Sequence, residues 1–389
     1  MRINPRVEAI ETPPIPQAHA WAAAYDGRLG PLLDLCQAVP GYPPHPEILR
    51  HAAAAAGERA NARYGLIPGD LPLRQAYAAD VSATYGGTVG PEEVAITAGC
   101  NQAFFLAMLT LAQGGDNVLL PLPWFWNHQQ SCAMLGIEPR PLPCRAENGF
   151  VPDADDAAGL VNERTRAIVL ITPNNPTGAV YPPAVIAAFH ALCVRRGITL
   201  ILDETYRDFL PEGQDRSHAL FADPDWPAHL VQLYSFSKAY CIPGHRLGAV
   251  VAEAGLVAQF TKVLDCMHIC PQRGAQDVLG WAIPALKEWR ARNRATINAR
   301  AEAVRTGFAA LAEGGWRLDS LGAYFAYVRH PFAAQTAARV TERLATELGA
   351  VGLPGSAFGP DQDGHLRLAF ANLPLDAVPD LVGRMQTLG

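Results

Sequence analysis

The chain has 389 residues, which is more than one ordinary domain needs, so its length predicts two domains or one large domain with a smaller appendage. Hydrophobic residues make up 49% and charged residues 17%, a balance that excludes intrinsic disorder for most of the chain. The formal net charge is −6, with 31 Lys and Arg against 37 Asp and Glu. This charge argues against binding of nucleic acid through its phosphates.

Membrane insertion, secretion and metal binding are also disfavoured. The uncharged stretch 94–115 is interrupted by polar residues, and we interpret it as a buried strand and helix. Residues 1–16 contain acids and prolines where a signal peptide needs an apolar run, so we expect a cytoplasmic protein. The eight cysteines form no Cys-x-x-Cys pair, which indicates reduced thiols and no metal site. Cys266 and Cys270 lie one helical turn apart, and we expect both in the core.

The first 45 residues are rich in proline, and we expect an irregular N-terminal arm that packs with the small domain or with a partner subunit. A helix is predicted from Pro46 to Gly57. After it, short aliphatic runs alternate with helical segments, which predicts a mainly parallel sheet flanked by helices. The expected strands are Val94–Thr97, Asn117–Leu120, Ala167–Ile171, Thr199–Leu202, His229–Tyr234 and Leu247–Val251.

The pattern of short apolar runs and helical segments changes near residue 285. A long charged helical stretch covers 285–314, and shorter strands and helices follow it. We therefore predict a large domain over 46–285 and a smaller C-terminal α/β domain over 286–389.

Chemically active side chains follow four of the expected strands. Ligands in parallel α/β sheets bind at the carboxyl ends of the strands, so these residues are expected to share one site. The four segments are Ala98-Gly99-Cys100-Asn101, Asn174-Asn175-Pro176-Thr177-Gly178, Asp203-Glu204-Thr205-Tyr206, and Ser235-Phe236-Ser237-Lys238 with Gly244-His245-Arg246.

Each segment alone has an ordinary explanation as a turn, a helix cap or a surface lysine. Together, an amide, an acid, a phenol, a lysine and an arginine at one sheet edge indicate pyridoxal phosphate (PLP) chemistry. A lysine forms an imine with the PLP aldehyde, and an acid keeps the pyridine nitrogen protonated. A phenol and an amide can bind the ring oxygen, while an arginine, a serine and a helix N-terminus can bind the phosphate.

These segments, together with Leu353-Pro354-Gly355-Ser356-Ala357-Phe358-Gly359, resemble the signatures of the class I/II aminotransferases of PLP fold type I. The resemblance runs from about Leu33 to Phe370. It implies PLP as cofactor, with Lys238 as the aldimine lysine and Asp203 as the partner of the pyridine nitrogen.

The resemblance also implies the other cofactor contacts. Asn175 and Tyr206 would donate to the phenolate oxygen of the ring. Ser235, Arg246 and the backbone amides of Gly99, Cys100 and Asn101 would hold the phosphate. The family places an aromatic residue against the ring, which implies Phe125, with Trp124 and Trp126 as alternatives. Tyr64, in Arg63-Tyr64-Gly65-Leu66, matches a tyrosine that reaches the phosphate of the neighbouring subunit, so a homodimer with shared sites is implied.

Two residues would contact the substrate besides Asn175. Arg367 matches the arginine that holds the α-carboxylate in a bidentate fork. The family commonly has glycine where this chain reads Gln37-Ala38-Val39-Pro40, so Ala38 is expected to give the carboxylate a modestly different wall. This departure leaves the identity of the substrate open.

The predicted function is transfer of an amino group between an L-amino acid and a 2-oxo acid, through a Lys238 aldimine and pyridoxamine phosphate. The same residues could serve a decarboxylase, a β-lyase, an oxidase or a synthase. The ligand-sensing domain of a transcription regulator would need a basic winged-helix segment upstream, and none precedes residue 30. A nicotinamide dehydrogenase would need Gly-x-Gly-x-x-Gly after a strand, which this sequence lacks.

Overall fold

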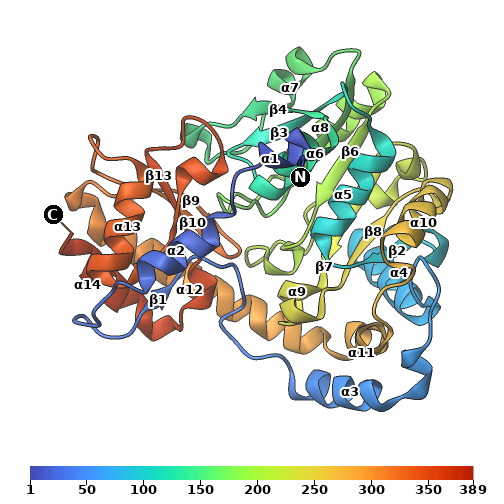
Figure 1. Ribbon diagram of the computed structural model, residues 1–389, viewed down its shortest axis with the longest axis horizontal. Helices are drawn as coiled ribbons and strands as arrows, with labels where there is room; N and C mark the ends of the chain where they lie inside the picture. The colour runs from blue at the N-terminus through green and yellow to red at the C-terminus, as the bar shows by residue number, and fades with distance from the viewer. Residues whose placement is uncertain (389) are drawn as a thin grey trace.

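A seven-stranded sheet forms the centre of the molecule in the computed structural model, which describes residues 1–388 (Figure 1). The order of its strands is β2-β8-β7-β6-β5-β3-β4, and β8 alone runs against its neighbours in this sheet. The strands are β2 (Val94–Thr97), β3 (Asn117–Leu122), β4 (Glu138–Pro143), β5 (Thr165–Ile171), β6 (Thr199–Asp203), β7 (Leu230–Ser235) and β8 (Gly248–Val251).

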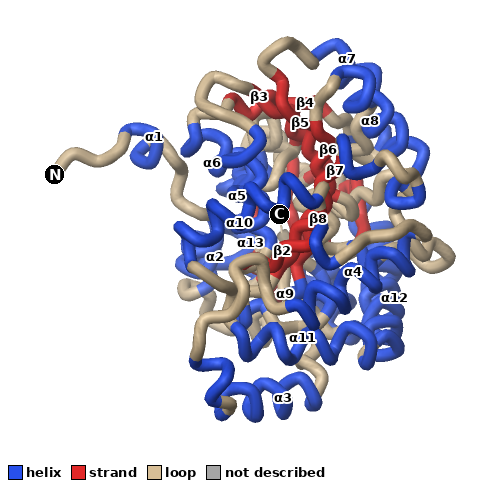
Figure 2. Tube along the Cα trace, turned by 90° about the vertical axis from the view of Figure 1, so that its right-hand side faces the viewer, coloured by secondary structure: helices blue, strands red, loops and turns tan. Residues whose placement is uncertain are grey.

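Helices cover both faces of this sheet, as the side view in Figure 2 shows. Helices α4, α8 and α11 contribute to the hydrophobic core on one face, and α5, α6 and α10 to the core on the other. The central strands are therefore buried on both sides, which explains why each reads as a continuous apolar run. The predicted α/β fold class is confirmed.

The helices are α1 (Pro5–Glu8), α2 (Pro14–Ala22), α3 (Pro46–Gly57), α4 (Leu71–Tyr85), α5 (Cys100–Leu111), α6 (Trp126–Leu135), α7 (Ala154–Leu160), α8 (Pro183–Arg196), α9 (Phe236–Ala239), α10 (Ala254–His268), α11 (Arg273–Ala285), α12 (Lys287–Leu311), α13 (Ala337–Leu348) and α14 (Val378–Gln386). Within residues 1–388, every helix is too short or too polar to cross a bilayer.

A second, antiparallel sheet lies in the C-terminal part of the chain, in the order β12-β13-β10-β9. Its strands are β9 (Arg317–Gly322), β10 (Phe325–Arg329), β12 (Leu353–Pro354) and β13 (His365–Leu368). The N-terminal segment joins this part: β1 (Leu33–Asp34) pairs in parallel with β11 (Ala350–Val351), and α2 packs against α13, as the blue and orange-red elements of Figure 1 show.

Most of the first 45 residues are irregular, as expected, but two short helices interrupt them. These helices are α1 and α2, whose first residues are Pro5 and Pro14. Proline is well tolerated at the first helical position because the N–H it lacks would have no partner there. Two of the prolines that suggested an irregular arm therefore mark helix starts.

The predicted strands differ from the observed ones by at most two residues at each end, but β4 was not predicted. Its sequence, Glu138-Pro139-Arg140-Pro141-Leu142-Pro143, has proline at alternate positions. Because proline cannot donate a backbone hydrogen bond, it reads as a strand breaker. It is tolerated here because β4 is an edge strand that pairs only with β3 among the described residues.

The expectation that Cys266 and Cys270 are core residues is wrong. Cys266 is exposed and Cys270 is half-buried. Helix α10 ends at His268, so Cys270 lies beyond the helix, where its Sγ accepts a hydrogen bond from the Gly65 backbone N–H at 3.3 Å. The helical spacing on which the expectation rested therefore does not extend to Cys270.

Helix α12 is fastened to the segment that follows β6 by a buried ion-pair network. The guanidinium of Arg290 binds the carboxylates of Asp208 at 2.8 Å and Asp80 at 3.1 Å. Asp80 also pairs with Arg207 at 2.5 Å. Because Asp208 lies five residues after Asp203, this network connects α12 to a predicted site segment.

Arg290→Ala should destabilise the protein by about 3 kcal/mol, because removing one partner of a buried ion pair leaves the opposing carboxylates uncompensated. Equilibrium urea unfolding followed by circular dichroism measures the effect. Arg292→Ala is the matched control on the same helix, since Arg292 is exposed and its nitrogen lies 3.8 Å from Glu288. Equal unfolding midpoints for the two variants would show that the network does not stabilise the fold.

Candidate active site

A cavity of about 550 Å³ lies at the carboxyl ends of β5, β6 and β7. It collects side chains from the main sheet, from the N-terminal segment and from the second sheet. The predicted site residues that line it are Ala38, Cys100, Asn101, Phe125, Asn175, Asp203, Tyr206, Ser235, Lys238, Arg246 and Arg367.

Lys238 lies on the short helix α9, directly after β7. Ser235 ends the strand and caps this helix, since its Oγ accepts a hydrogen bond from the Ser237 backbone N–H at 3.3 Å. The Lys238 Nζ donates to the carbonyl oxygen of Ala38. Burial, together with the positive charges of Arg367 and Arg246, lowers the pKa of Lys238 to about 8. The amine is therefore still mostly protonated at physiological pH, but its neutral fraction is far larger than that of an ordinary lysine.

Asp203 is the last residue of β6, and its carboxylate is buried at the floor of the cavity. Burial opposes its ionisation, but contacts with His128 and Thr205 outweigh burial and hold the pKa of Asp203 below its usual value. The Thr205 backbone N–H donates to Asp203 Oδ1 at 3.0 Å. The carboxylate is therefore ionised and fixed in place.

The opposite end of the cavity can hold an anion. Gly99 ends the turn after β2 with φ +87°, and the backbone amides that follow it open α5. The left-handed backbone at position 99 favours glycine, and a Cβ there would meet the guanidinium of Arg246. The Arg246 guanidinium donates to the carbonyl oxygens of Pro243 at 2.9 Å and Ala98 at 3.4 Å. An arginine beside a helix N-terminus is a suitable site for a phosphate.

Arg367 and Asn175 come from different sheets and meet in the cavity. Arg367 Nη1 donates to Asn175 Oδ1 at 3.1 Å, and Nη2 donates to the carbonyl oxygen of Cys36. Because the amide oxygen of Asn175 accepts from Arg367, its Nδ2 group is the one that can donate to a ligand. Burial lowers the pKa of Arg367 to about 10, yet the side chain remains a cation at neutral pH.

The turn that carries Asn175 is held by its neighbours. Asn174 Oδ1 accepts hydrogen bonds from the Thr177 backbone N–H at 3.1 Å and from the Thr177 hydroxyl at 2.8 Å. Gly178 has φ +77° and lies close to the backbone of Gly322 in the second sheet. The turn therefore positions Asn175 rigidly between the two sheets.

Tyr206 lies beside Asp203 in the cavity and packs against Tyr324 and Phe325 of the C-terminal part of the chain. Its pKa is raised, chiefly by burial. The phenol is therefore neutral at physiological pH, so its O–H can donate a hydrogen bond to a ligand.

The structure distinguishes the three aromatic residues considered for the ring face, Trp124, Phe125 and Trp126, by the hollows that they line. Phe125 and Trp126 line the cavity, whereas Trp124 lines two neighbouring hollows. The Trp126 ring also lies 5.5 Å from the guanidinium carbon of Arg367. Trp124 is therefore excluded as a wall of this cavity.

Tyr64 does not reach the cavity of its own chain. It is 78% exposed and lines a separate hollow beside Asp70 and Arg273. A role for Tyr64 at a cofactor therefore requires a second subunit.

His128 is a site residue that the sequence reasoning missed. Its Nε2 lies 3.3 Å from Asp203 Oδ2, and its ring stacks on Phe104 with the centroids 3.8 Å apart. The histidine stands three residues after Phe125, in the first turn of α6, and no motif in the sequence marks it. Its contact with Asp203 joins residues 75 positions apart, which no local pattern indicates.

His128→Phe should lower kcat/KM about tenfold, because a contact to a charged carboxylate is typically worth about 1.5 kcal/mol. The ring stack with Phe104 is kept while the contact with Asp203 is lost. Removing this contact raises the pKa of Asp203, so the loss should grow as the pH falls. A pH profile beside His190→Phe, a buried histidine of α8, provides the control. A loss that is the same at every pH would contradict the assigned effect on Asp203.

The ends of the mainly parallel strands bring together a buried lysine, an ionised carboxylate and a site for an anion. This combination defines a PLP enzyme of fold type I. The family model for aminotransferase class I and II matches residues 31–385, so the chain belongs to this family. It is a PLP-dependent aminotransferase, which transfers an amino group between an amino acid and a 2-oxo acid.

Named relatives agree with this assignment. The chain is 31% identical to the arginine–pyruvate transaminase of Pseudomonas aeruginosa over 309 residues, covering 79% of this chain and 78% of the relative. It is 31% identical to the aspartate/prephenate aminotransferase of Thermus thermophilus, covering 84% and 83% of the two chains. The solved aspartate aminotransferase of Thermus thermophilus with maleate superposes with a TM-score of 0.89 at 26% identity, covering 99% of each chain.

The residues of the cavity fit PLP. Lys238 supplies an amine, and Asp203 supplies a carboxylate. The Gly99 turn and Arg246 leave space for a phosphate, and a Cβ at position 99 would fill this space. Arg367 Nε is buried and has no hydrogen-bond partner within residues 1–388, so it can bind a substrate carboxylate.

Proposed function

We propose that this aminotransferase acts on L-amino acids with uncharged side chains, and that the predicted site residues perform the reaction. The observation that carries the substrate class is the distribution of charge in the cavity. Among the described residues that line it, the charged ones are Asp203, Lys238, Arg246 and Arg367. Each has a partner in the cofactor or in the substrate α-carboxylate, so none is left for a charged side chain.

The rest of the wall carries no formal charge. It is apolar, aromatic or amide, apart from the hydroxyls of Thr205, Tyr206, Ser235 and Ser237 and the thiol of Cys100. Pro13 and Ile15 come from the N-terminal segment, and Trp126 from α6. Asn101 Nδ2 donates to Asn127 Oδ1 at 3.3 Å, so two neutral amides satisfy each other beside these residues. A side-chain carboxylate or ammonium would lose water here without gaining an opposite charge, which costs several kcal/mol.

The relatives do not decide the substrate by name. Their names include aspartate, arginine, aromatic amino acids and valine, which cover acidic, basic, aromatic and aliphatic side chains. The chemistry of the cavity is therefore the support for the proposed class.

In this proposal Arg367 binds the substrate α-carboxylate through a two-point fork, and Asn175 fixes the guanidinium. When bound, PLP supplies an aldehyde for the substrate amine and a ring that accepts electrons from Cα. Asp203 holds the proton on the pyridine nitrogen, while Tyr206 and the amide of Asn175 donate to the ring oxygen. Lys238 takes the proton from Cα, and Ser235, Arg246 and the Gly99 turn hold the phosphate. Phe125 covers the ring face, and Ala38 borders the carboxylate.

A kinetic panel tests the substrate class. The holoenzyme is assayed with phenylalanine, leucine, glutamine, aspartate, glutamate and lysine as donors and one common 2-oxo acid acceptor. The expected kcat/KM for the best neutral donor exceeds that for every charged donor at least tenfold. A charged donor that equals the best neutral one would overturn the class, whereas no transfer from any donor would question the aminotransferase reaction.

We also propose that the enzyme is a cytoplasmic homodimer in which each site borrows Tyr64 from its partner. The exposed Tyr64 and the neighbouring Leu66, 53% exposed, leave an apolar surface that association would bury.

The eight free cysteines support the proposed cytoplasmic location, because the cytoplasm is a reducing compartment. The division into an arm (1–45), a large domain (46–285) and a small domain (286–389) remains part of this proposal.

Mixing inactive Tyr64→Ala and Lys238→Ala subunits should restore up to about half of the wild-type activity per dimer. A heterodimer with shared sites places both lesions in one site and leaves the other intact. Co-refolded mixtures are assayed beside sedimentation measurements that establish heterodimer formation. No recovered activity in demonstrated heterodimers, or an active enzyme that sediments as a monomer, would contradict the shared sites.

A further inference from the structure

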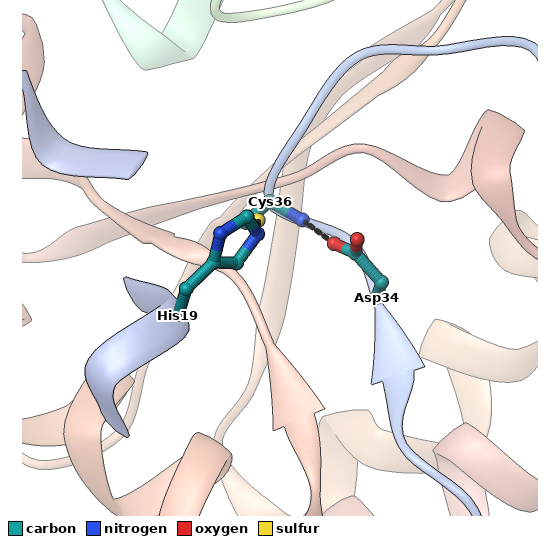
Figure 3. Close-up of side chains that lie close together, drawn as sticks. All are labelled: His19, Asp34 and Cys36. Carbon is teal, nitrogen blue, oxygen red and sulfur yellow. Dashed lines mark hydrogen bonds between the residues drawn. The ribbon is translucent and has the colours of Figure 1, made fainter. Parts of the chain in front are cut away.

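Three potential metal ligands converge beside the active-site cavity, although the sequence indicated no metal site. Figure 3 shows the side chains of His19, Asp34 and Cys36 facing one another. His19 Nε2 lies 3.4 Å from Cys36 Sγ, and one ligand atom from each residue lies within 4.8 Å of the other two. Residue 19 is distant in sequence from the other two, so the group is created by the fold.

Two elements position these side chains. His19 projects from α2, which packs against α13. Asp34 ends β1, and Cys36 lies in the bend two residues later. The segment that contains both is anchored by backbone hydrogen bonds from Leu33 to Gly349 and from Leu35 to Val351, both at 2.8 Å.

The local geometry of this segment holds its two ligands together. Asp34 Oδ1 accepts a hydrogen bond from the Cys36 backbone N–H at 2.9 Å, drawn as the dashed line in Figure 3. The Cys36 side chain is buried, whereas His19 and Asp34 are exposed. An ion at this point would be enclosed on the sulfur side and open to water on the other.

We propose that His19, Asp34 and Cys36 bind Zn²⁺, with water as the fourth ligand. An imidazole nitrogen, a thiolate sulfur and a carboxylate oxygen are the ligand types that zinc prefers, whereas Mg²⁺ and Ca²⁺ select oxygen. Bonds of about 2.0–2.3 Å to zinc place ligand atoms between about 3 and 4 Å apart. The His19–Cys36 separation already lies in this range. When the zinc–sulfur bond forms, the thiol proton is released to solvent, so the charge balances.

The proposed ion would be connected to the catalytic cavity through Cys36. The carbonyl oxygen of Cys36 accepts a hydrogen bond from Arg367, and the carbonyl of Ala38, two residues on, accepts one from Lys238. Ile15, one turn before His19 on α2, lines the same cavity. Zinc would therefore fasten α2 to the segment 34–38 and limit the movement of two walls of the substrate site.

Metal binding by the holoenzyme tests the proposal. Protein freed of metal with a chelator is dialysed to equilibrium against Zn²⁺, and bound zinc is measured by elemental analysis. The expected result is one zinc per chain, with affinity at least tenfold weaker in His19→Ala and in Asp34→Asn. Cys266→Ser, which removes an exposed thiol elsewhere, should bind zinc like the wild type. The site is overturned if the wild type binds no zinc, or if His19→Ala and Asp34→Asn bind as the wild type does.

Co²⁺ gives an independent readout of the ligand geometry. A tetrahedral site with a thiolate ligand should give intense absorption in the red part of the visible spectrum, away from the absorption of PLP, and Cys36→Ser should weaken it. An unchanged spectrum in this variant would exclude Cys36 as a ligand. The KM for the amino acid should shift at least twofold with Zn²⁺ in the wild type and not in His19→Ala. Equal responses of the two proteins would overturn the link to the cavity.

Discussion

Lys238→Ala should retain PLP without a covalent bond and lose turnover by at least about three orders of magnitude. In the proposed mechanism Lys238 is both the amine that holds the aldehyde and the base that takes the proton from Cα, and loss of such combined roles lowers turnover by this much. The proposed phosphate contacts at Gly99 and Arg246 would remain, so cofactor content should stay close to that of the wild type. Single-turnover kinetics, together with PLP released on denaturation, measure the two quantities.

Chemical labelling can identify the lysine that binds the cofactor, because the chain has few lysines. It contains three lysines, Lys238, Lys262 and Lys287. Lys262 and Lys287 are exposed, whereas Lys238 lines the cavity. Borohydride reduction of the holoenzyme followed by peptide mapping should place the cofactor on Lys238. A label on either of the other two, or near-normal turnover in Lys238→Ala, would reject the site.

The pH dependence of cofactor capture provides a second check. The pKa of Lys238 is lowered to about 8, so its amine is protonated below that pH and neutral above it. Only the neutral amine can attack an aldehyde. The apoenzyme should therefore react with pyridoxal, which lacks the phosphate, at a rate that rises through about pH 8. A midpoint above pH 10 would show that burial and the two arginines do not act on this amine.

Asp203→Ala should reduce kcat by at least about three orders of magnitude while reducing PLP content much less. Asp203 is buried, and its lowered pKa keeps it ionised, which is tolerable when an opposite charge lies against it. Without the carboxylate, the pyridine nitrogen loses its proton and the ring accepts electrons poorly. Rapid-mixing kinetics and cofactor content separate chemistry from binding.

A double variant distinguishes direct from indirect effects at this carboxylate. If His128 acts through Asp203, His128→Phe should add little in the Asp203→Ala background. Asp203→Glu, which keeps the charge, should recover part of the lost turnover. Near-normal turnover in Asp203→Ala would reject the role of the carboxylate, and additive losses in the double variant would show a separate role for His128.

Much of the fold was readable from local sequence. The aliphatic runs predicted six strands of the main sheet, because strands buried on both faces need apolar residues at every position. The helix Pro46–Gly57 was predicted to the residue. The residues that follow the strands were expected to converge, since parallel strands end at one edge, and Asn175, Asp203 and Lys238 do line one cavity.

Other features were decided by tertiary structure alone. Strand β4 was hidden by prolines, which its edge position tolerates. Only the structure shows that Phe125 and Trp126 line the cavity and that Trp124 does not. Exposure at Cys266 likewise depends on which face of α10 is covered.

The contacts that complete the site join residues far apart in the chain. His128 of α6 meets Asp203 at the end of β6, and Arg367 meets Asn175 because the turn after β5 lies against the second sheet. His19 meets Cys36 because α2 packs beside the segment that follows β1. A sequence pattern reports the periodicity and turns of its own segment, so it determined the strands and the residues at their ends. Which of those residues touch depends on how separate elements pack, and only the tertiary structure decided that.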